Sequence, residues 1–138
     1  MRFMSSDFYS IIERHKIVDH RGFFLKTMTG LEPDLSNSFG EIYVIKGCEG
    51  KVRANHYHNA ATEWFTLIQG KVRLNLKHVD TGQTVSLLLT DEAPVTVRVN
   101  PRVAHSLIGI DLSDYIVMAY TDVRYDPVDT IAHVPTEL

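Results

Sequence analysis

Short runs in which apolar and polar residues alternate are the feature that most restricts how this chain can fold. In residues 71–77, valine and leucine occupy every second position, and lysine, arginine and asparagine occupy the positions between them. Because successive side chains of a strand point to opposite faces, this alternation predicts a strand with one buried face. Similar runs recur along the chain, and no segment shows the apolar period of a long amphipathic helix.

Turn residues separate these runs and thereby place the predicted strands. Gly70 permits a tight turn, and the Asp-Thr-Gly-Gln segment 80–83 is typical of a β-hairpin. About nine or ten short strands, with a turn roughly every eight to twelve residues, indicate an all-β sandwich or barrel. The predicted strands are residues 21–28, 39–46, 52–58, 63–69, 71–77, 84–89, 95–99, 104–110 and 115–122.

A chain of 138 residues is long enough for one domain with its own core. We divide the single domain 1–138 into an N-terminal strand region at about 1–30, a barrel core at about 39–122 and an irregular tail at about 123–138. The net charge of −3 argues against nucleic acid or an anionic membrane surface as a partner. The lone Cys48 excludes an internal disulfide, and no apolar run is typical of a signal peptide or a membrane span. A cytoplasmic protein is therefore expected.

Two histidines and a glutamate near the middle of the chain form a candidate metal site. His56 and His58 are two residues apart, so in a strand both side chains point to the same face. The short polar link 59–61 can turn the chain into a second strand that carries Glu63. Two imidazoles and a carboxylate then converge from adjacent strands, which predicts a divalent transition-metal site that lacks only a fourth ligand.

The spacing of these residues resembles a known family motif. From Gly50 to Gly70 the chain reads Gly-x5-His-x-His-x4-Glu-x6-Gly, which matches the first motif of the cupin superfamily without a gap. A cupin's second motif is Pro-x-Gly-x2-His; here His105 is in place, but Asn100 and Arg102 stand at the proline and glycine positions. The resemblance implies a jelly-roll β-barrel in which His105 supplies the fourth ligand.

Further segments resemble a narrower group of cupins. The pattern Asp-x-Arg-Gly-x-Phe at 19–24 resembles the N-terminal signature of nucleotide-sugar 3,5-epimerases of the dTDP-rhamnose pathway and of related 3,4-ketoisomerases. Residues 53–58 are closer still to the Arg-Gly-Asn-His-x-His segment in the C-terminal cupin domain of capsular-polysaccharide reductase/epimerases, and residues 125–130 resemble the end of that domain. The resemblance covers roughly residues 17–131. It implies a homodimer that acts on a nucleotide-linked 4-keto-6-deoxyhexose in polysaccharide synthesis.

The resemblance also implies roles for individual residues. The reaction would be proton abstraction next to the ketone followed by reprotonation, which needs a base, an acid and a stabiliser of the enolate oxygen. His56 corresponds to the base of the epimerases, and Tyr120 is the best match for their late-strand acid, with Tyr115 and Tyr125 nearby. Arg21 and Arg53 correspond to the arginines that contact the diphosphate. Lys26 is also expected to bind the substrate.

The complete set of four ligands leaves the role of His56 open. Epimerases that work without metal do not keep all of His56, His58, Glu63 and His105, whereas the capsular cupin domain combines a metal with sugar chemistry. The expected cofactor is a divalent transition metal, with zinc first and nickel, manganese or iron as alternatives. If His56 binds the metal it cannot also accept the proton, and the base is then another residue or a water on the metal.

Three further expectations concern geometry and alternative functions. Strict alternation places Arg53 on the face opposite His56, so it reaches the cavity only through a β-bulge near residues 54–55 or at the barrel mouth. Trp64 is expected on the outer face or at a dimer interface, and the apolar strand 23–25 is expected to cross to the partner's sheet. The alternative functions are a metal cupin of other chemistry, such as an iron dioxygenase, and a non-catalytic sugar-binding cupin.

Overall fold

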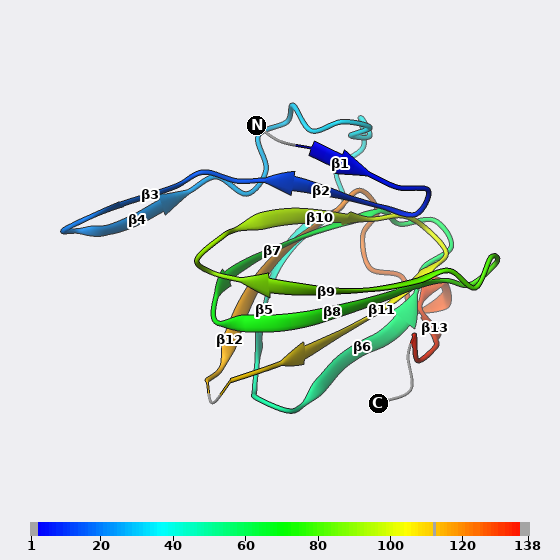
Figure 1. The fold of residues 1–138 in the computed structure, drawn as a ribbon. Helices are drawn as coiled ribbons and strands as arrows, with labels where there is room; N and C mark the ends of the chain where they lie inside the picture. Colours follow the sequence, from blue (N-terminus) through cyan, green and yellow to red (C-terminus); the bar gives the residue numbers. More distant parts are fainter. Residues whose placement is uncertain (1–2, 112, 136–138) are drawn as a thin grey trace.

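Two antiparallel sheets face each other in the computed structural model, which describes residues 3–111 and 113–135 (Figure 1). The larger sheet has the strand order β1-β2-β10-β7-β12-β5. Its strands are β1 (Phe3–Ser5), β2 (Tyr9–Glu13), β10 (Val95–Val99), β7 (Glu63–Gln69), β12 (Tyr115–Thr121) and β5 (Glu41–Gly47). The order is not that of the chain, because the connections cross from one sheet to the other, as in a jelly roll.

The smaller sheet has five strands in the order β13-β6-β11-β8-β9. These strands are β13 (Ile131–Ala132), β6 (Val52–Tyr57), β11 (Val103–Gly109), β8 (Lys71–His78) and β9 (Thr84–Thr90). A separate hairpin of β3 (Lys16–Asp19) and β4 (Gly22–Leu25) projects from the barrel as an arm (Figure 1). Within the described residues, no helix is long and apolar enough to cross a membrane.

The core lies between the two sheets and follows the alternation read from the sequence. Val72, Leu74 and Leu76 of β8 are fully buried, whereas Arg73 and Lys77 are partly exposed; Asn75 departs from the alternation, because it is buried and hydrogen-bonded to Ser86 and Ser106. From the facing sheet, Phe65 and Leu67 of β7 contribute to the same core. The prediction of an all-β jelly-roll barrel is confirmed, and each strand predicted after residue 38 is present with its ends shifted by at most two residues.

The N-terminal region contains more strands than predicted. A single strand was expected at 21–28, but the structure has four strands before residue 26 and ends β4 at Leu25. Strands β1 and β3 have only three and four residues, so their alternation is too short to recognise. Strand β2 forms because it pairs along its whole length with β10, which a local pattern does not reveal.

The C-terminal segment contains two short regular elements, which corrects the prediction of an irregular tail for residues 127–129 and 131–132. A short 3₁₀-helix, η1 (Pro127–Asp129), is followed by β13, which pairs with the end of β6. Asp126 caps the 3₁₀-helix by accepting a hydrogen bond from the amide of Val128 at 2.9 Å. The side chain of Asp129 accepts the amides of residues 59 and 60 at 2.9 and 3.1 Å. These contacts tie the tail to the loop that follows β6.

The outer face of the larger sheet is covered by residues 26–40. Thr96 donates a hydrogen bond to the carbonyl of Thr27, and Arg98 pairs with Asp34 at 2.8 Å. Trp64 faces this side, as expected, and only 1% of it is exposed. The sheet is therefore buried on both faces over its central strands.

Candidate functional site

Three histidines and one glutamate converge inside the barrel, as the sequence predicted. His56 lies on β6, His58 follows the end of that strand, Glu63 begins β7 and His105 lies on β11. Strands β6 and β11 are neighbours whose register places His105 opposite His56. One ligand atom from each of the four residues lies within 4.8 Å of the other three.

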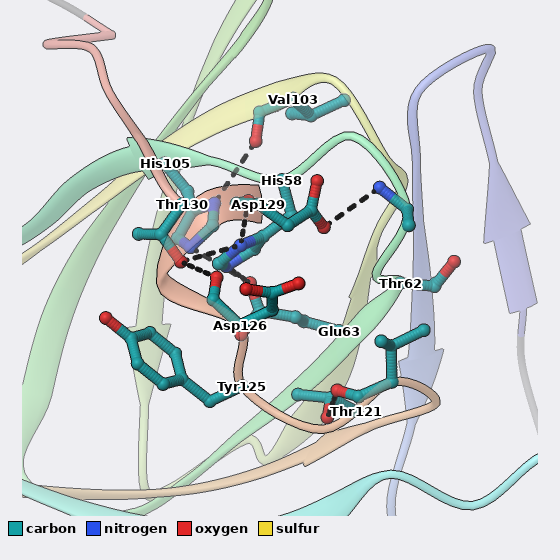
Figure 2. Close-up of polar contacts among 12 residues, drawn as sticks. His58, Thr62, Glu63, Val103, His105, Thr121, Tyr125, Asp126, Asp129 and Thr130 are labelled. Atoms are coloured by element: carbon teal, nitrogen blue, oxygen red, sulfur yellow. Dashed lines mark hydrogen bonds and ion pairs between the residues drawn. The ribbon is translucent and has the colours of Figure 1, made fainter.

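Backbone carbonyls orient two of the histidines (Figure 2). The Nδ1 atom of His58 lies 3.0 Å from the carbonyl oxygen of Asp129, and Nδ1 of His105 lies 3.1 Å from that of Val103. A carbonyl oxygen only accepts hydrogen bonds, so in both rings Nδ1 carries the hydrogen. In the neutral ring, the lone pair is then on Nε2, and both Nε2 atoms point at Glu63 Oε1, at 3.0 and 3.2 Å. Metal-binding histidines are held in this way.

The surroundings of the Glu63 carboxylate show whether a cation fits this site. Glu63 is only 3% exposed, and its Oε1 atom has no hydrogen bond of ordinary geometry among the described residues. A buried carboxylate oxygen that faces two imidazole lone pairs is unfavourable unless a positive charge lies between them. Nitrogen and carboxylate ligands in this number suit zinc and related divalent ions. The four residues therefore fit a transition metal.

The pKa shifts of Glu63 and His58 also indicate that this site favours a positive charge. Burial alone would raise the pKa of Glu63, but His105 and His58 outweigh burial and hold the pKa well below its usual range. Burial lowers the pKa of His58, but the adjacent carboxylate of Glu63 outweighs burial, so the net shift is upward. Burial, together with His105 and His58, lowers the pKa of His56 to about 4. His56 is therefore neutral at neutral pH.

Tyr43 is a site residue that the sequence analysis missed. It lies on β5, and its hydroxyl donates a hydrogen bond to Glu63 Oε2, the carboxylate oxygen that does not face the histidines. In the sequence, Tyr43 alternates with Ile42 and Val44 inside a predicted strand, and nothing there separates it from a core tyrosine. The contact depends on two strands far apart in the chain.

A cavity of about 380 Å³ opens beside the three histidines and Glu63 and is lined by two arginines, Arg53 and Arg124. Three further acidic residues of its wall are held by backbone amides: Glu41 by Tyr125, Asp126 by Val128, and Asp129 by Asn59 and Ala60. Neither arginine forms an ion pair with any residue in the described part of the chain. The two guanidinium groups are therefore available to an anion. Arg124 was not predicted, because the tail was expected to be irregular.

Arg53 reaches the cavity through a β-bulge, as its position required. Ala54 and Asn55 have φ angles of 72° and 55°, and the pairing of β6 with β11 skips one residue between His56 and Ala54. The extra residue shifts the alternation by one position. Arg53 therefore shares the cavity with His56 instead of pointing to the opposite side of the sheet.

Tyr120 lies outside the cavity, which corrects its assignment as the catalytic acid. The neighbouring Thr121 lines the cavity, so strand alternation turns Tyr120 to the outer face. Its ring packs against Trp64 and Phe39, with ring centroids at 5.3 and 5.5 Å, and its hydroxyl donates to the carbonyl of Ser38. The assignment followed the position of a tyrosine in a late strand without deciding which face that residue occupies.

Arg21 and Lys26 also lie away from the cavity of their own chain. Arg21 is in the turn of the β3–β4 arm, where its guanidinium pairs with Asp19 at 2.6 Å and both side chains are exposed. Lys26 is exposed just after β4, and neither cation is among the residues that line the cavity. Neither residue therefore reaches the cavity of its own chain, and contact of the arm with the cavity of a partner stays a prediction.

Arg102 stands at the glycine position of the Pro-x-Gly-x2-His motif, and its contacts compensate for the missing glycine. Its φ angle is 65°, a left-handed conformation that glycine adopts most easily, which explains a glycine in this place. The arginine gains compensating contacts: its guanidinium donates two hydrogen bonds to Asp80 and one to Asn59, at 2.6–2.7 Å. Its amide donates to the carbonyl of His58 at 2.7 Å. The turn before β11 is thus tied to the loop that carries His58.

Solved structures share this fold. A dTDP sugar isomerase from Desulfovibrio desulfuricans G20 matches with a TM-score of 0.84 and 20% identity, over 92% of this chain and 84% of that chain. The dTDP-6-deoxy-D-glucose-3,5-epimerase of Legionella pneumophila, in complex with dTDP-4-keto-L-rhamnose, matches at 0.82 and 16%, over 95% and 76%. The capsular polysaccharide assembling protein CapF of Staphylococcus aureus matches at 0.66 and 20%, over 88% of this chain but 34% of that chain.

A family match extends over most of the sequence. Comparison with curated proteins finds no match. The family described as the polysaccharide biosynthesis C-terminal domain matches residues 17–131, a span that includes the three histidines, Glu63 and both cavity arginines. The chain, a cupin jelly roll in structure, therefore belongs to the polysaccharide biosynthesis C-terminal domain family.

Proposed function

We propose that this protein epimerises or isomerises a nucleotide-linked 4-keto-6-deoxyhexose during synthesis of a cell-surface polysaccharide. The observation that carries the proposal is one cavity that combines four residues suited to a metal with two arginines that have no ion pair among the described residues. The family match and the fold shared with dTDP-sugar epimerases support this substrate class, with dTDP as the first nucleotide to test.

The proposed cofactor is a divalent transition metal, zinc first, held by His56, His58, Glu63 and His105. When bound, such an ion supplies positive charge that stabilises the negative oxygen of an enolate. We assign His56 to the ligand set rather than to the base. A pKa lowered to about 4 makes a weak base at neutral pH, and its ring centroid lies within 4.9 Å of those of His58 and His105.

The proton transfers are proposed to use Tyr125 and Asp126. Both line the cavity, and neither belongs to the ligand set. Figure 2 shows them on the C-terminal segment that borders the site with Glu63. Tyr43 is a poorer candidate, because its hydroxyl is already bonded to Glu63, and burial and the charge of Glu63 raise its pKa far above the usual range.

The arginines are proposed to bind the diphosphate. The protein is net negative, so bulk attraction does not collect an anionic substrate, and local cations must do so. Arg53 lies on β6 and Arg124 lies on the C-terminal segment, so the cavity has a guanidinium on two separate elements. A planar guanidinium can donate two parallel hydrogen bonds to phosphate oxygens.

Deuterium exchange tests the proposed activity. The zinc-loaded protein is incubated with a dTDP-linked 4-keto-6-deoxyhexose in deuterated water, and loss of the C3 and C5 proton signals is followed by NMR. We expect enzyme-dependent exchange that falls strongly in Tyr125→Phe and is unchanged in the matched control Tyr120→Phe, because Tyr120 lies on the outer face.

Other outcomes identify the alternatives. Binding of the nucleotide sugar without exchange at either carbon would indicate a non-catalytic sugar-binding cupin. Failure to bind any nucleoside diphosphate, with metal retained, would indicate a metal cupin of other chemistry.

A further inference from the structure

We propose that Tyr43 is a positioning residue that keeps Glu63 a one-oxygen ligand and so leaves one side of the metal site open to the cavity. This inference rests on the metal set of the proposed function. The two oxygens of Glu63 have different surroundings: Oε1 faces Nε2 of His58 and of His105, whereas Oε2 accepts the hydroxyl of Tyr43.

The fold makes room for this contact across an intervening strand. In the larger sheet, β12 lies between β5 and β7, so Tyr43 and Glu63 are not on neighbouring strands. On β12, Ala119 is paired with Tyr43, and Thr121 is paired with Glu63. Both are small, so the tyrosine can extend over them to the carboxylate. A larger residue at 119 or 121 would occupy this space.

The hydrogen bond matters because a carboxylate can bind a metal through one oxygen or through both. A donor on Oε2 occupies the second oxygen and fixes the plane of the carboxylate, so that only Oε1 points to the ion. Loss of the hydroxyl would free Oε2 to turn toward the metal. Glu63 would then occupy a coordination position that a keto oxygen of the substrate needs.

A one-atom change tests this role. Tyr43→Phe removes only the hydroxyl of a partly buried tyrosine, and Tyr115→Phe is the control, because Tyr115 is a buried tyrosine whose hydroxyl has no hydrogen-bond partner in the described part of the chain. Zinc affinity is measured by competition with a chromogenic chelator. We expect a loss of about 10- to 100-fold in Tyr43→Phe and no change in Tyr115→Phe.

A spectroscopic readout separates positioning from general stability. Cobalt(II) is substituted for zinc, and its visible absorption is recorded, because the intensity falls as the coordination number rises. We expect a weaker spectrum in Tyr43→Phe and the native spectrum in Tyr115→Phe. Circular dichroism checks that both variants fold. A second variant, Tyr43→Met, which also lacks a donor, is measured in the same way and should reproduce the change.

The outcomes distinguish this inference from the proposed function. Native zinc affinity and a native cobalt spectrum in Tyr43→Phe and Tyr43→Met would overturn the positioning role, whatever the exchange experiment shows. A native protein that binds neither zinc nor cobalt would overturn the metal site and this inference together. A changed spectrum in the variants, combined with no proton exchange in the native enzyme, would keep the positioning role and reject the epimerase.

Discussion

Two carboxylates are almost fully buried on opposite sides of the larger sheet, and their surroundings differ. Glu32, in the segment that covers the outer face, is 5% exposed and accepts hydrogen bonds from the amide and hydroxyl of Thr29 and from Arg14 at 2.9 Å. Glu63, in the cavity, is 3% exposed, yet its Oε1 faces two imidazole nitrogens without an ordinary hydrogen bond. Burial alone therefore does not mark a functional carboxylate.

The two carboxylates differ in what neutralises them. The carboxylate of Glu32 is bonded to donors of the protein itself, whereas Oε1 of Glu63 is left for a ligand. The protein closes the outer face with its own donors, as is usual for buried polar groups. In the cavity, Glu63 Oε1 and the Nε2 atoms of His58 and His105 face one another, and Arg53 and Arg124 have no ion pair within residues 3–111 and 113–135. Glu32 therefore provides a comparison, within the same protein, for the surroundings of Glu63.

The largest expected effect comes from removing each carboxylate in turn. Glu32→Ala removes a buried acceptor from Arg14 and from Thr29 and should lower the free energy of unfolding by about 1–3 kcal/mol while leaving metal content unchanged. Glu63→Ala should reduce bound metal from about one ion per chain to nearly none, with a much smaller effect on the metal-free protein. Urea unfolding and elemental analysis measure the two quantities.

Two results would remove the contrast between these carboxylates. One is equal metal content in Glu63→Ala and the native protein, and the other is a larger loss of metal-free stability in Glu63→Ala than in Glu32→Ala. His58→Ala is a second test of the metal set and should lose metal as Glu63→Ala does.

The arginines give the next largest effect. Arg53→Ala should weaken binding of a nucleoside diphosphate and of its sugar conjugate alike, by about 10- to 100-fold, because one charge-assisted contact to phosphate is lost. Arg124→Ala should act in the same direction. Arg53→Lys keeps the charge but loses the planar fork, so it should restore only part of the affinity. Calorimetric titration measures these changes, with metal content as the control.

Arg21→Ala sharpens this prediction, because Arg21 already has a carboxylate partner on the exposed arm. If a partner's arm does not reach the cavity, this variant should bind like the native protein. Equal losses in Arg21→Ala and Arg53→Ala would show that the arm contributes to a neighbouring site.

The outer face is left open at one edge, which leads to a prediction about assembly. Strand β5 is the edge of the larger sheet, and Ile42 and Val44 on it are 55% and 60% exposed. The arm exposes Phe23 and Phe24 in the same way, at 49% and 58%. An unpaired edge and an apolar arm are complementary. We expect a homodimer by light scattering, shifted toward monomer by Phe24→Ser; a native monomer at micromolar concentration would contradict this.

The parts of the molecule that could be predicted are those set by local patterns. Alternation located the barrel strands, and the convergence of His56, His58 and Glu63 is as predicted. The expectation that they come from adjacent strands is wrong, because β6 and β7 follow each other in the chain but lie in the two facing sheets. Tyr43 and Arg124 were not found, because β5 and the C-terminal segment reach the site through long-range pairing. Tyr120 was misplaced because a shift of one residue along a strand exchanges the two faces of the sheet.

The smallest expected effect is the pH dependence of the outer-face carboxylate. Burial alone would raise the pKa of Glu32, but the amide of Thr29 and the guanidinium of Arg14 contribute to a net lowering. A carboxylate whose pKa is lower in the folded state adds stability above its unfolded pKa of about 4.3, and loses that contribution as the pH falls through the folded value. Glu32→Gln should therefore be less stable than the native protein at pH 7, and the difference should shrink as the pH falls below about 4. Urea unfolding of both proteins between pH 7 and pH 3 measures it, in the presence of a chelator, so that metal loss from the cavity does not contribute. A difference that stays constant over this range would show that hydrogen bonding, and not the charge of Glu32, secures the outer face.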